Sequence, residues 1–167
     1  MGCGCGANLY LMLNEGFDVG GMDYSNTQIN IAKKVFKDKK MRELLCGEAL
    51  SLPTDVKYDA LVANSVFSYF SDDEYARTVL DKMIDKTTCS IGLIDIHDID
   101  KREEFIKYRR KTVENYDEKY KNLQKHFYNR DFFIGWAKEN NVTAEFCDSD
   151  VDGYWNNEFV FDVYFYR

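Results

Sequence analysis

The sequence predicts an α/β fold: a mostly parallel sheet with helices on both faces and an antiparallel C-terminal strand. Three observations lead to this prediction. A glycine-rich turn at residues 2–6 runs directly into an apolar helical segment, and strand and helix patterns alternate as far as residue 96. Such alternation is typical of a parallel sheet between two layers of helices. Residues 158–166 then alternate between two sets of side chains, as a strand in an antiparallel pair does.

Length, composition and charge narrow the class of protein. The 167 residues suffice for one domain with a proper core, and 45% hydrophobic residues exclude disorder. The net charge of −7 argues against nucleic acid or an anionic membrane as the main partner, since both need basic surface. No segment approaches the roughly 18 apolar residues of a membrane helix, and none resembles a signal peptide. We therefore expect a soluble, cytoplasmic protein.

The cysteines form neither a CxxC pair nor a zinc-binding spacing. We interpret all five as reduced structural thiols, as is usual in the cytoplasm, and expect no metal site. They are Cys3, Cys5, Cys46, Cys89 and Cys147.

The first half of the chain is expected to alternate helices with short buried strands. Gly16 stops the first helix, and the strand after it ends on a carboxylate, Asp23. Ser25 is a good N-cap for the second helix, whose apolar residues keep helical spacing. The predicted order is helix 7–15, strand 17–23, the helix after Ser25, strand 41–46, loop 47–53, strand 57–63 and the uncharged loop 64–70.

The second half begins in the same way and then changes. Asp72 and Asp73 open a helix with one apolar face, and residues 89–96 form the clearest buried strand. Residues 100–125 are charged, rich in tyrosine and helical in tendency, without a clean strand. The predicted closing elements are an amphipathic helix over 129–140 and strands over 142–147 and 158–166.

The functional site is expected at the carboxyl ends of the strands, where sheets of this class bind ligands. The glycine turn before the first helix lets a ligand approach bare main chain at a helix N-terminus. Asp23 follows Gly4 by 19 positions, about where a carboxylate accepts hydrogen bonds from ribose hydroxyls. A helix N-terminal charge is the plainer interpretation of Asp23, and we favour the ribose role. The other strand ends bring Glu48-Ala49, Asn64-Ser65 and residues 95–97 to this edge.

Four successive motifs over residues 1–96 resemble those of Rossmann-like S-adenosyl-L-methionine-dependent methyltransferases. They read GCGCG at residues 2–6, GMDYS at 21–25, CGEALSLP at 46–53 and YDALVANSV at 58–66. Each motif alone is common, but their order and spacing together are specific. The resemblance implies a single methyltransferase-like domain over 1–167. Its parts are a cofactor-binding half (1–96), a helical acceptor-side segment (97–128) and a closing helix with strands (129–167).

The resemblance also implies a role for each matched position. The backbone around the glycine turn lies along the methionine part of the cofactor. Asp23 accepts hydrogen bonds from the ribose hydroxyls, and Tyr24 lies near the adenine. Glu48 with Ala49 caps the adenine edge, and Asn64 with Ser65 lines the pocket near the sulfonium. A cationic sulfonium suits carbonyl and aromatic surroundings better than a phosphate cradle. The implied turn residues are Gly2, Cys3, Gly4 and Gly6.

The tail has a weaker resemblance, to methyltransferases found with bacterial surface-polysaccharide biosynthesis. It rests on LIDIHD at residues 93–98, YRR at 108–110, EKYK at 118–121 and FYNRDFF at 127–133. This similarity implies a sugar or another small hydroxylated acceptor.

This sequence departs from the family pattern at its N-terminus. Family members carry a central strand before the glycine turn, and here the chain begins at Met1. We expect that the true protein starts upstream, because losing a central strand leaves two neighbours with unpaired backbone. If residues 1–167 are the whole protein, we expect weaker cofactor binding and pairing with another chain, for example as a homodimer.

Two histidines are candidate general bases for an oxygen acceptor, since methyl transfer depends mainly on positioning and gains from a base. His97 follows the strand that ends at Asp95, and His126 lies in the variable segment. The plainer interpretation of each is a surface or hydrogen-bonded histidine. Arg109 and Arg110 present a similar choice between binding a substrate phosphate or carboxylate and forming a solvated helix face.

Two alternatives to the methyltransferase interpretation make different demands on the sequence. An NAD-dependent oxidoreductase needs GxGxxG, whereas the turn here is GxGxG followed by Ala7, and no Gly-Lys-Ser/Thr of a P-loop follows. The other alternative is a non-catalytic methyltransferase-like protein or truncated domain that acts through partner binding. The missing strand favours it, and the intact Asp23, Glu48 and Asn64 positions argue against it.

Overall fold

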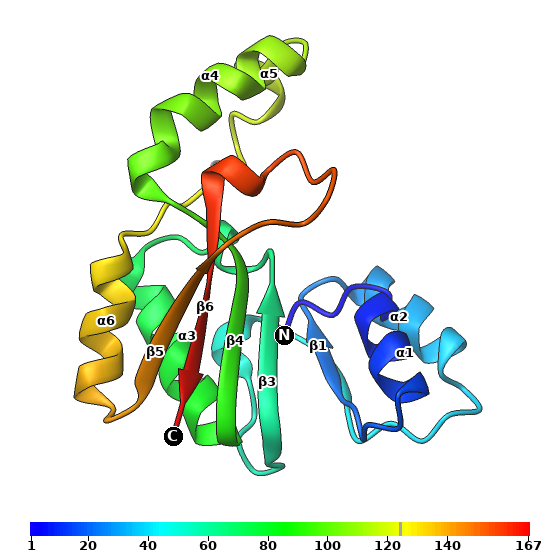
Figure 1. Ribbon diagram of the computed structural model, residues 1–167. Helices are drawn as coiled ribbons and strands as arrows, with labels where there is room; N and C mark the ends of the chain where they lie inside the picture. The colour runs from blue at the N-terminus through cyan, green and yellow to red at the C-terminus, as the bar shows by residue number, and fades with distance from the viewer. Residues whose placement is uncertain (124) are drawn as a thin grey trace.

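The computed structural model describes residues 1–123 and 125–167. The strands form two sheets, one of two strands and one of four (Figure 1). In chain order the helices and strands are α1 (Ala7–Asn14), β1 (Gly21–Asp23), α2 (Asn26–Val35), β2 (Leu44–Cys46), β3 (Tyr58–Asn64), α3 (Asp73–Lys86), β4 (Thr87–His97), α4 (Arg102–Thr112), α5 (Tyr116–Lys119), α6 (Arg130–Glu139), β5 (Thr143–Asp148) and β6 (Val160–Tyr166).

The strand directions confirm the predicted class. The small sheet pairs β1 with β2 in parallel, and the large sheet has the order β3-β4-β6-β5. In the large sheet β3 and β4 are parallel, while β6 runs antiparallel to both of its neighbours. In Figure 1, α3 and α6 lie on one side of the strands and α1 and α2 on the other. The fold is therefore α/β with an antiparallel C-terminal part.

Helix starts follow the local signals in the sequence. The Ser25 hydroxyl caps α2 by accepting from the Gln28 N–H at 3.3 Å, and Asp72 caps α3 by accepting from the Tyr75 N–H at 2.8 Å. Asn129 does the same for α6. Each cap satisfies an amide that the first helical turn leaves without a partner.

The first two strands are shorter than the sequence predicts. We expected strands over 17–23 and 41–46, and only Gly21–Asp23 and Leu44–Cys46 pair. The reason is that β1 has a neighbour on one side only, β2, so there is no second ladder to hold residues 17–20 extended.

The large core lies between the four-stranded sheet and the helices α3 and α6. The indole of Trp136 is 1% exposed and donates to Asp81 at 2.8 Å, and the buried Tyr128 hydroxyl donates to the Phe67 carbonyl at 2.8 Å. Both aromatic groups thus keep their polar atoms paired while burying their rings. A smaller cluster joins α1 and α2 to the two-stranded sheet, around Leu9, Val19, Ala32 and Phe36.

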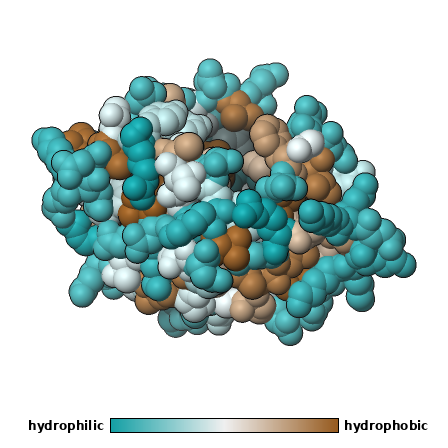
Figure 2. Space-filling model, turned by 90° about the horizontal axis from the view of Figure 1, so that it is seen from below, coloured by the Kyte–Doolittle hydropathy of each residue, from teal (hydrophilic) through white to brown (hydrophobic). Residues whose placement is uncertain are grey.

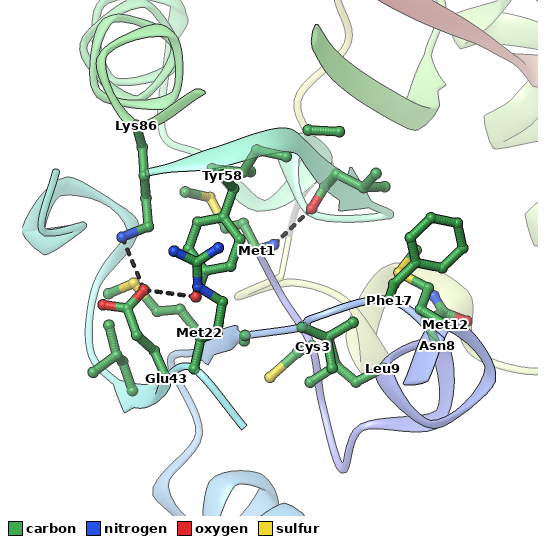
Figure 3. A pocket seen from close by; sticks show the side chains of 18 of the residues that line it. Met1, Cys3, Asn8, Leu9, Met12, Phe17, Met22, Glu43, Tyr58 and Lys86 are labelled. Atoms are coloured by element: carbon green, nitrogen blue, oxygen red, sulfur yellow. Dashed lines mark hydrogen bonds and ion pairs between the residues drawn. The ribbon is translucent and has the colours of Figure 1, made fainter. Parts of the chain in front are cut away.

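A cavity of about 480 Å³ separates the two sheets. It is lined on one side by residues of β1 and α1, such as Met22 and Leu9, and on the other by Leu61 and Val62 of β3 (Figure 3). The amino group of Met1 donates to the Val62 carbonyl at 2.6 Å, and the Cys3 N–H donates to the Met22 carbonyl at 3.0 Å. The first three residues therefore contact both sheets, while the rest of the facing edges of β1 and β3 have no strand between them.

A buried ion pair closes the end of this cavity near the start of β3. The Lys86 ammonium lies 3.0 Å from the Glu43 carboxylate, and their side chains are only 4% and 12% exposed. Tyr58 donates to the same carboxylate at 3.0 Å, so burial and this hydrogen bond raise the pKa of Tyr58. At the α1 side, by contrast, Leu11 and Phe17 are more than 60% exposed. Figure 2 shows hydrophobic side chains gathered in patches on an otherwise hydrophilic face.

The structure bears on two features of the composition, the apolar segments and the cysteines. Within the described residues, no helix is long and apolar enough to span a membrane. The five cysteines are free thiols, but Cys5, Cys46, Cys89 and Cys147 are exposed, so they are not the core residues that structural thiols would be.

Candidate functional site

The glycine turn forms a tight bend before α1. Gly2, Gly4 and Gly6 all have positive φ, at 66°, 53° and 95°, a region that residues with a Cβ seldom adopt. A Cβ on Gly6 would lie 2.4 Å from the Phe36 ring, so this glycine is needed for packing. A Cβ on Gly4 would meet nothing within 4 Å. The backbone at Gly4 is thus open to a ligand.

Asp23, the last residue of β1, is tied to this turn. One carboxylate oxygen accepts from the Gly4 N–H at 2.8 Å and the other from the Ser25 N–H at 2.8 Å. A carboxylate has about four lone-pair sites, so two remain for further donors such as a pair of hydroxyls. Asp23 and the glycine turn are thus in direct contact, and the ribose role of Asp23 stays a prediction.

The loop after β2 reaches the same edge. The Gly47 N–H donates to the Asp23 carbonyl at 3.0 Å, which holds the loop beside β1. Glu48 is exposed, and one of its oxygens accepts from the Tyr75 hydroxyl at 3.2 Å. Ala49 is half-buried at the start of a short 3-10 turn, and Tyr24 is 73% exposed. These side chains border an open surface beside Asp23.

Asn64 and Ser65 lie at the end of β3, across from the glycine turn. The two elements touch, because a Cβ on Gly2 would lie 2.2 Å from a methyl group of Val66. Ser65 has φ 55°, and its N–H donates to the Ile94 carbonyl at 3.0 Å. This bend turns the Ser65 hydroxyl toward both Asn64, at 3.1 Å, and Asp95 of β4.

Asp95 is a site residue that the sequence did not single out. Its carboxylate is buried, with 7% of the residue exposed, and one oxygen accepts from the Ser65 hydroxyl. The other accepts from the Tyr154 hydroxyl at 2.8 Å and from the Asn156 amide at 2.9 Å. Burial and the hydrogen bond to Asp95 raise the pKa of Tyr154 to about 12. Asp95 therefore joins three chain segments at the carboxyl end of the sheet.

The backbone at Asp95 is also unusual. It has φ 65°, and the pairing of β4 with β6 shifts register between Leu93 and Ile96. The Asp95 N–H donates to the Asp162 carboxylate at 2.9 Å instead of to a ladder carbonyl. A bulge of this kind redirects a side chain, and it is common near functional sites. Sequence marked Asp95 only as a strand end; its partners lie about 60 positions further along the chain.

His97 lies inside an aromatic cluster next to this bulge. It is 2% exposed and packs edge-on against Phe105 at 4.9 Å and Phe127 at 5.4 Å between ring centroids. Burial, with the charge of Lys125 nearby, lowers its pKa to about 4. His97 is therefore neutral at pH 7, and its Nδ1 is buried without a partner among the described residues.

His126 is placed differently. Its ring Nε2 lies 2.8 Å from a carboxylate oxygen of Asp73. Its backbone N–H donates to the Ser68 carbonyl at 2.9 Å. The side chain is 25% exposed and stands edge-on to Tyr128. This arrangement holds the imidazole over the loop that follows β3, with the carboxylate fixing its orientation.

The two arginines of α4 are both occupied. The guanidinium of Arg109 lies 4.7 Å from the centre of the Trp155 ring and also covers two tyrosines. The Arg110 Nε donates to both carboxylate oxygens of Asp117, at 3.0 and 3.1 Å. Each of these two cations on the helix face therefore has a specific partner within the chain. No group of three or more metal-binding side chains occurs in the described part of the chain.

Comparison with known proteins points to one activity. Residues 1–87 match a family model described as a methyltransferase domain. Magnesium protoporphyrin IX methyltransferase from Synechocystis PCC 6803 with bound SAH (S-adenosylhomocysteine) is similar over 99% of this chain and 71% of its own, with 13% identity and a TM-score of 0.73. A SAM-dependent methyltransferase from Methanosarcina mazei is also 13% identical, over 99% of this chain and 89% of its own, at TM-score 0.73.

A third similar structure is the plantazolicin methyltransferase BpumL in complex with a triazolic desmethylPZN analog and SAH. It is 14% identical over 99% of this chain and 74% of its own, with a TM-score of 0.72. At such identities the structures show a shared fold. The sequence has no significant match among curated proteins.

Proposed function

Because the chain belongs to the methyltransferase domain family, whose model matches residues 1–87, we propose that it transfers a methyl group from S-adenosyl-L-methionine to a small-molecule acceptor. The observation that carries the proposal is that the glycine turn contacts Asp23 through Gly4 and lies against Val66, two residues beyond Asn64 at the end of β3. Two solved structures of this fold hold SAH.

The residues at this edge fit the cofactor. The open backbone at Gly4 leaves space beside the turn, and Asp23 keeps two lone-pair sites for ribose hydroxyls. Glu48 and Tyr24 border the surface where an adenine would lie. When bound, S-adenosylmethionine supplies an electrophilic methyl group on a cationic sulfonium. The protein then has to align an acceptor with that methyl group and to exclude water.

Titration calorimetry with S-adenosylhomocysteine tests the cofactor site. We expect micromolar binding that Asp23→Asn weakens by about tenfold or more, because ribose hydroxyls lose a charged acceptor. Asn retains one oxygen for the Gly4 or Ser25 amide, so the variant should fold. Asp38→Asn, an exposed carboxylate on the α2 side, is the matched control. Unchanged affinity in Asp23→Asn would refute the proposed site.

A general base for an oxygen acceptor would come from His97 or His126, and we favour His126. It is partly exposed and is oriented by Asp73, whereas His97 is enclosed by Phe105 and Phe127. Under this proposal His126→Gln lowers kcat by about 10²–10⁴-fold with an oxygen acceptor. A sugar or another hydroxylated metabolite remains our proposed acceptor. Equal kcat in the variant would remove His126 from the mechanism.

The space between β1 and β3 favours a second possibility, a protein that is complete only when a strand is added. We propose that an extended apolar strand joins the two sheets, because both facing edges carry unpaired backbone and the walls are apolar. Without it, the domain would act through partner binding or as one chain of a homodimer.

An added strand can be tested directly. Six apolar, β-branched residues placed before Met1 should raise the melting temperature and tighten S-adenosylhomocysteine binding. The control is the same extension with two central prolines, which lack the N–H groups needed for pairing. If both extensions behave alike, no strand pairs in this space.

A further inference from the structure

A second cavity lies under the helices α4 and α5, away from the cofactor site. Its volume is about 200 Å³, and it is lined by basic and aromatic side chains with a single carboxylate, Asp117. The lining residues are Arg102, Ile106, Arg110, Tyr116, Asp117, Tyr120, Lys121, Leu123, Lys125 and Phe127. Asp117 is already paired with Arg110, so the other three cations that line the cavity, Arg102, Lys121 and Lys125, do not share its charge.

The charge of this segment is opposite to that of the whole protein. Residues 101–125 contain nine lysines and arginines against five aspartates and glutamates, a net charge of +4, whereas the whole chain carries −7. Within the described residues, Arg102, Lys121 and Lys125 form no salt bridge with a carboxylate. Like charges around a small cavity repel one another, and a bound anion offsets this repulsion.

The cavity also adjoins the side from which an acceptor would approach. The Lys125 ammonium contacts the Ser68 hydroxyl at 3.0 Å and lies 3.5 Å from the centre of the Tyr69 ring, in the loop after β3. Phe127, which lines the cavity, packs on His97 at the end of β4. The same loop begins at Ser65, directly after Asn64 at the end of β3, so the cavity and the proposed methyl-transfer site share one connecting segment.

We propose that this cavity binds a phosphate group carried by the methyl acceptor. Resting on the proposed function, the inference narrows the substrate class to a small phosphorylated molecule. Arg102, Lys121 and Lys125 would hold the phosphate oxygens with charge-assisted hydrogen bonds. The volume is below the roughly 300–1,000 Å³ of pockets that enclose a drug-sized ligand, so one end of the acceptor is bound here and the rest reaches toward β3 and β4.

The arrangement corrects one expectation from sequence. Arg109 and Arg110 were the candidates for a phosphate or carboxylate on the substrate, but Arg109 is not among the residues that line the cavity and Arg110 is paired with Asp117. Arg102, about two turns earlier on α4, and Lys121, beyond α5, take that role instead.

The test is calorimetric titration of the full chain with inorganic phosphate. We expect millimolar binding that the double variant Arg102→Gln/Lys121→Gln weakens by about tenfold. The control is Lys107→Gln/Lys111→Gln, which removes the same charge from α4 at exposed positions outside the cavity and should change the affinity by less than about twofold. Equal weakening in both would mean diffuse surface charge and would overturn the proposal.

Two further measurements keep the inference separate from the proposed function. Acetate should bind more weakly than phosphate, and equal or tighter acetate binding would overturn the phosphate assignment. S-adenosylhomocysteine binding should be unchanged in both double variants, as neither touches the glycine turn or Asp23. A native chain that binds S-adenosylhomocysteine but not phosphate refutes this inference alone, whereas a native chain that binds phosphate but not S-adenosylhomocysteine refutes the methyltransferase proposal. Should the cavity variant misfold, Lys121→Gln alone, at an exposed residue, gives the same comparison against Lys111→Gln.

Discussion

Replacing Asp95 tests the buried junction at the end of β4. Its carboxylate accepts hydrogen bonds from Ser65, Tyr154 and Asn156, and its backbone has φ 65°. In Asp95→Ala the three donors lose this acceptor, and each buried donor left unpaired costs about 1–3 kcal/mol. The Asn156 amide is the one fully enclosed in protein, while water can reach Tyr154, so we expect a total loss of about 2–4 kcal/mol.

Two further substitutions separate the side chain from the backbone. Asp95→Gly loses the same acceptor but removes the penalty of a left-handed residue, so it should be about 1 kcal/mol more stable than Asp95→Ala. Asp95→Asn keeps one oxygen for Tyr154 and Asn156, and Ser65 can turn its hydroxyl to Asn64; this variant should lose less than about 1.5 kcal/mol.

Urea unfolding followed by tryptophan fluorescence measures the three free energies, because Trp136 is buried in the core. Asp152→Ala, at an exposed position, serves as the control and should lie within about 0.5 kcal/mol of the native chain. The reasoning fails if Asp95→Ala costs less than about 1 kcal/mol, or if Asp95→Gly is no more stable than Asp95→Ala.

Two other predictions concern stability alone. The pKa of His97 is lowered to about 4 in the folded protein, so between pH 6.5 and 4 the unfolded chain binds the extra proton and stability falls as the pH falls, by up to about 3 kcal/mol. His97→Gln should flatten this part of the stability–pH curve, and an unchanged slope would show that His97 does not cause it. Gly6→Ala should cost about 2 kcal/mol or more, since its φ is 95° and the added Cβ would meet Phe36. Gly135→Ala, inside α6 with open space around it, should instead stabilise by about 0.5–1 kcal/mol; a thermal melt that ranks the two glycine variants in the opposite order contradicts the assignment.

The sequence predicted correctly those structural features that depend on residues close together in the chain. The helix caps at Ser25 and Asp72, the glycine turn and the order of strands and helices all appear where expected, because each depends on a few residues close in the chain. The contact between Gly4 and Asp23 could also be anticipated, since the carboxyl ends of neighbouring parallel strands meet at one edge.

Features that depend on distant partners could not be predicted in the same way. His97 was a candidate base by its place after a strand, yet Phe105 and Phe127 enclose it and keep it neutral. Arg109 and Arg110 looked equally free, yet Trp155 and Asp117 engage them. Whether a polar side chain is available depends on what packs around it in three dimensions.

The sequence by itself therefore determined the α/β class and the residue types that the glycine turn and Asp23 supply, and it predicted the sheet edge at which we propose the site. Only the tertiary structure decided that Asp95 joins Ser65 to Tyr154 and that a basic cavity forms beneath α4 and α5. The physical reason is the range of the interactions. Caps, turns and periodicity act over a few residues, whereas strand pairing, burial and the clustering of charge join residues that the chain holds far apart.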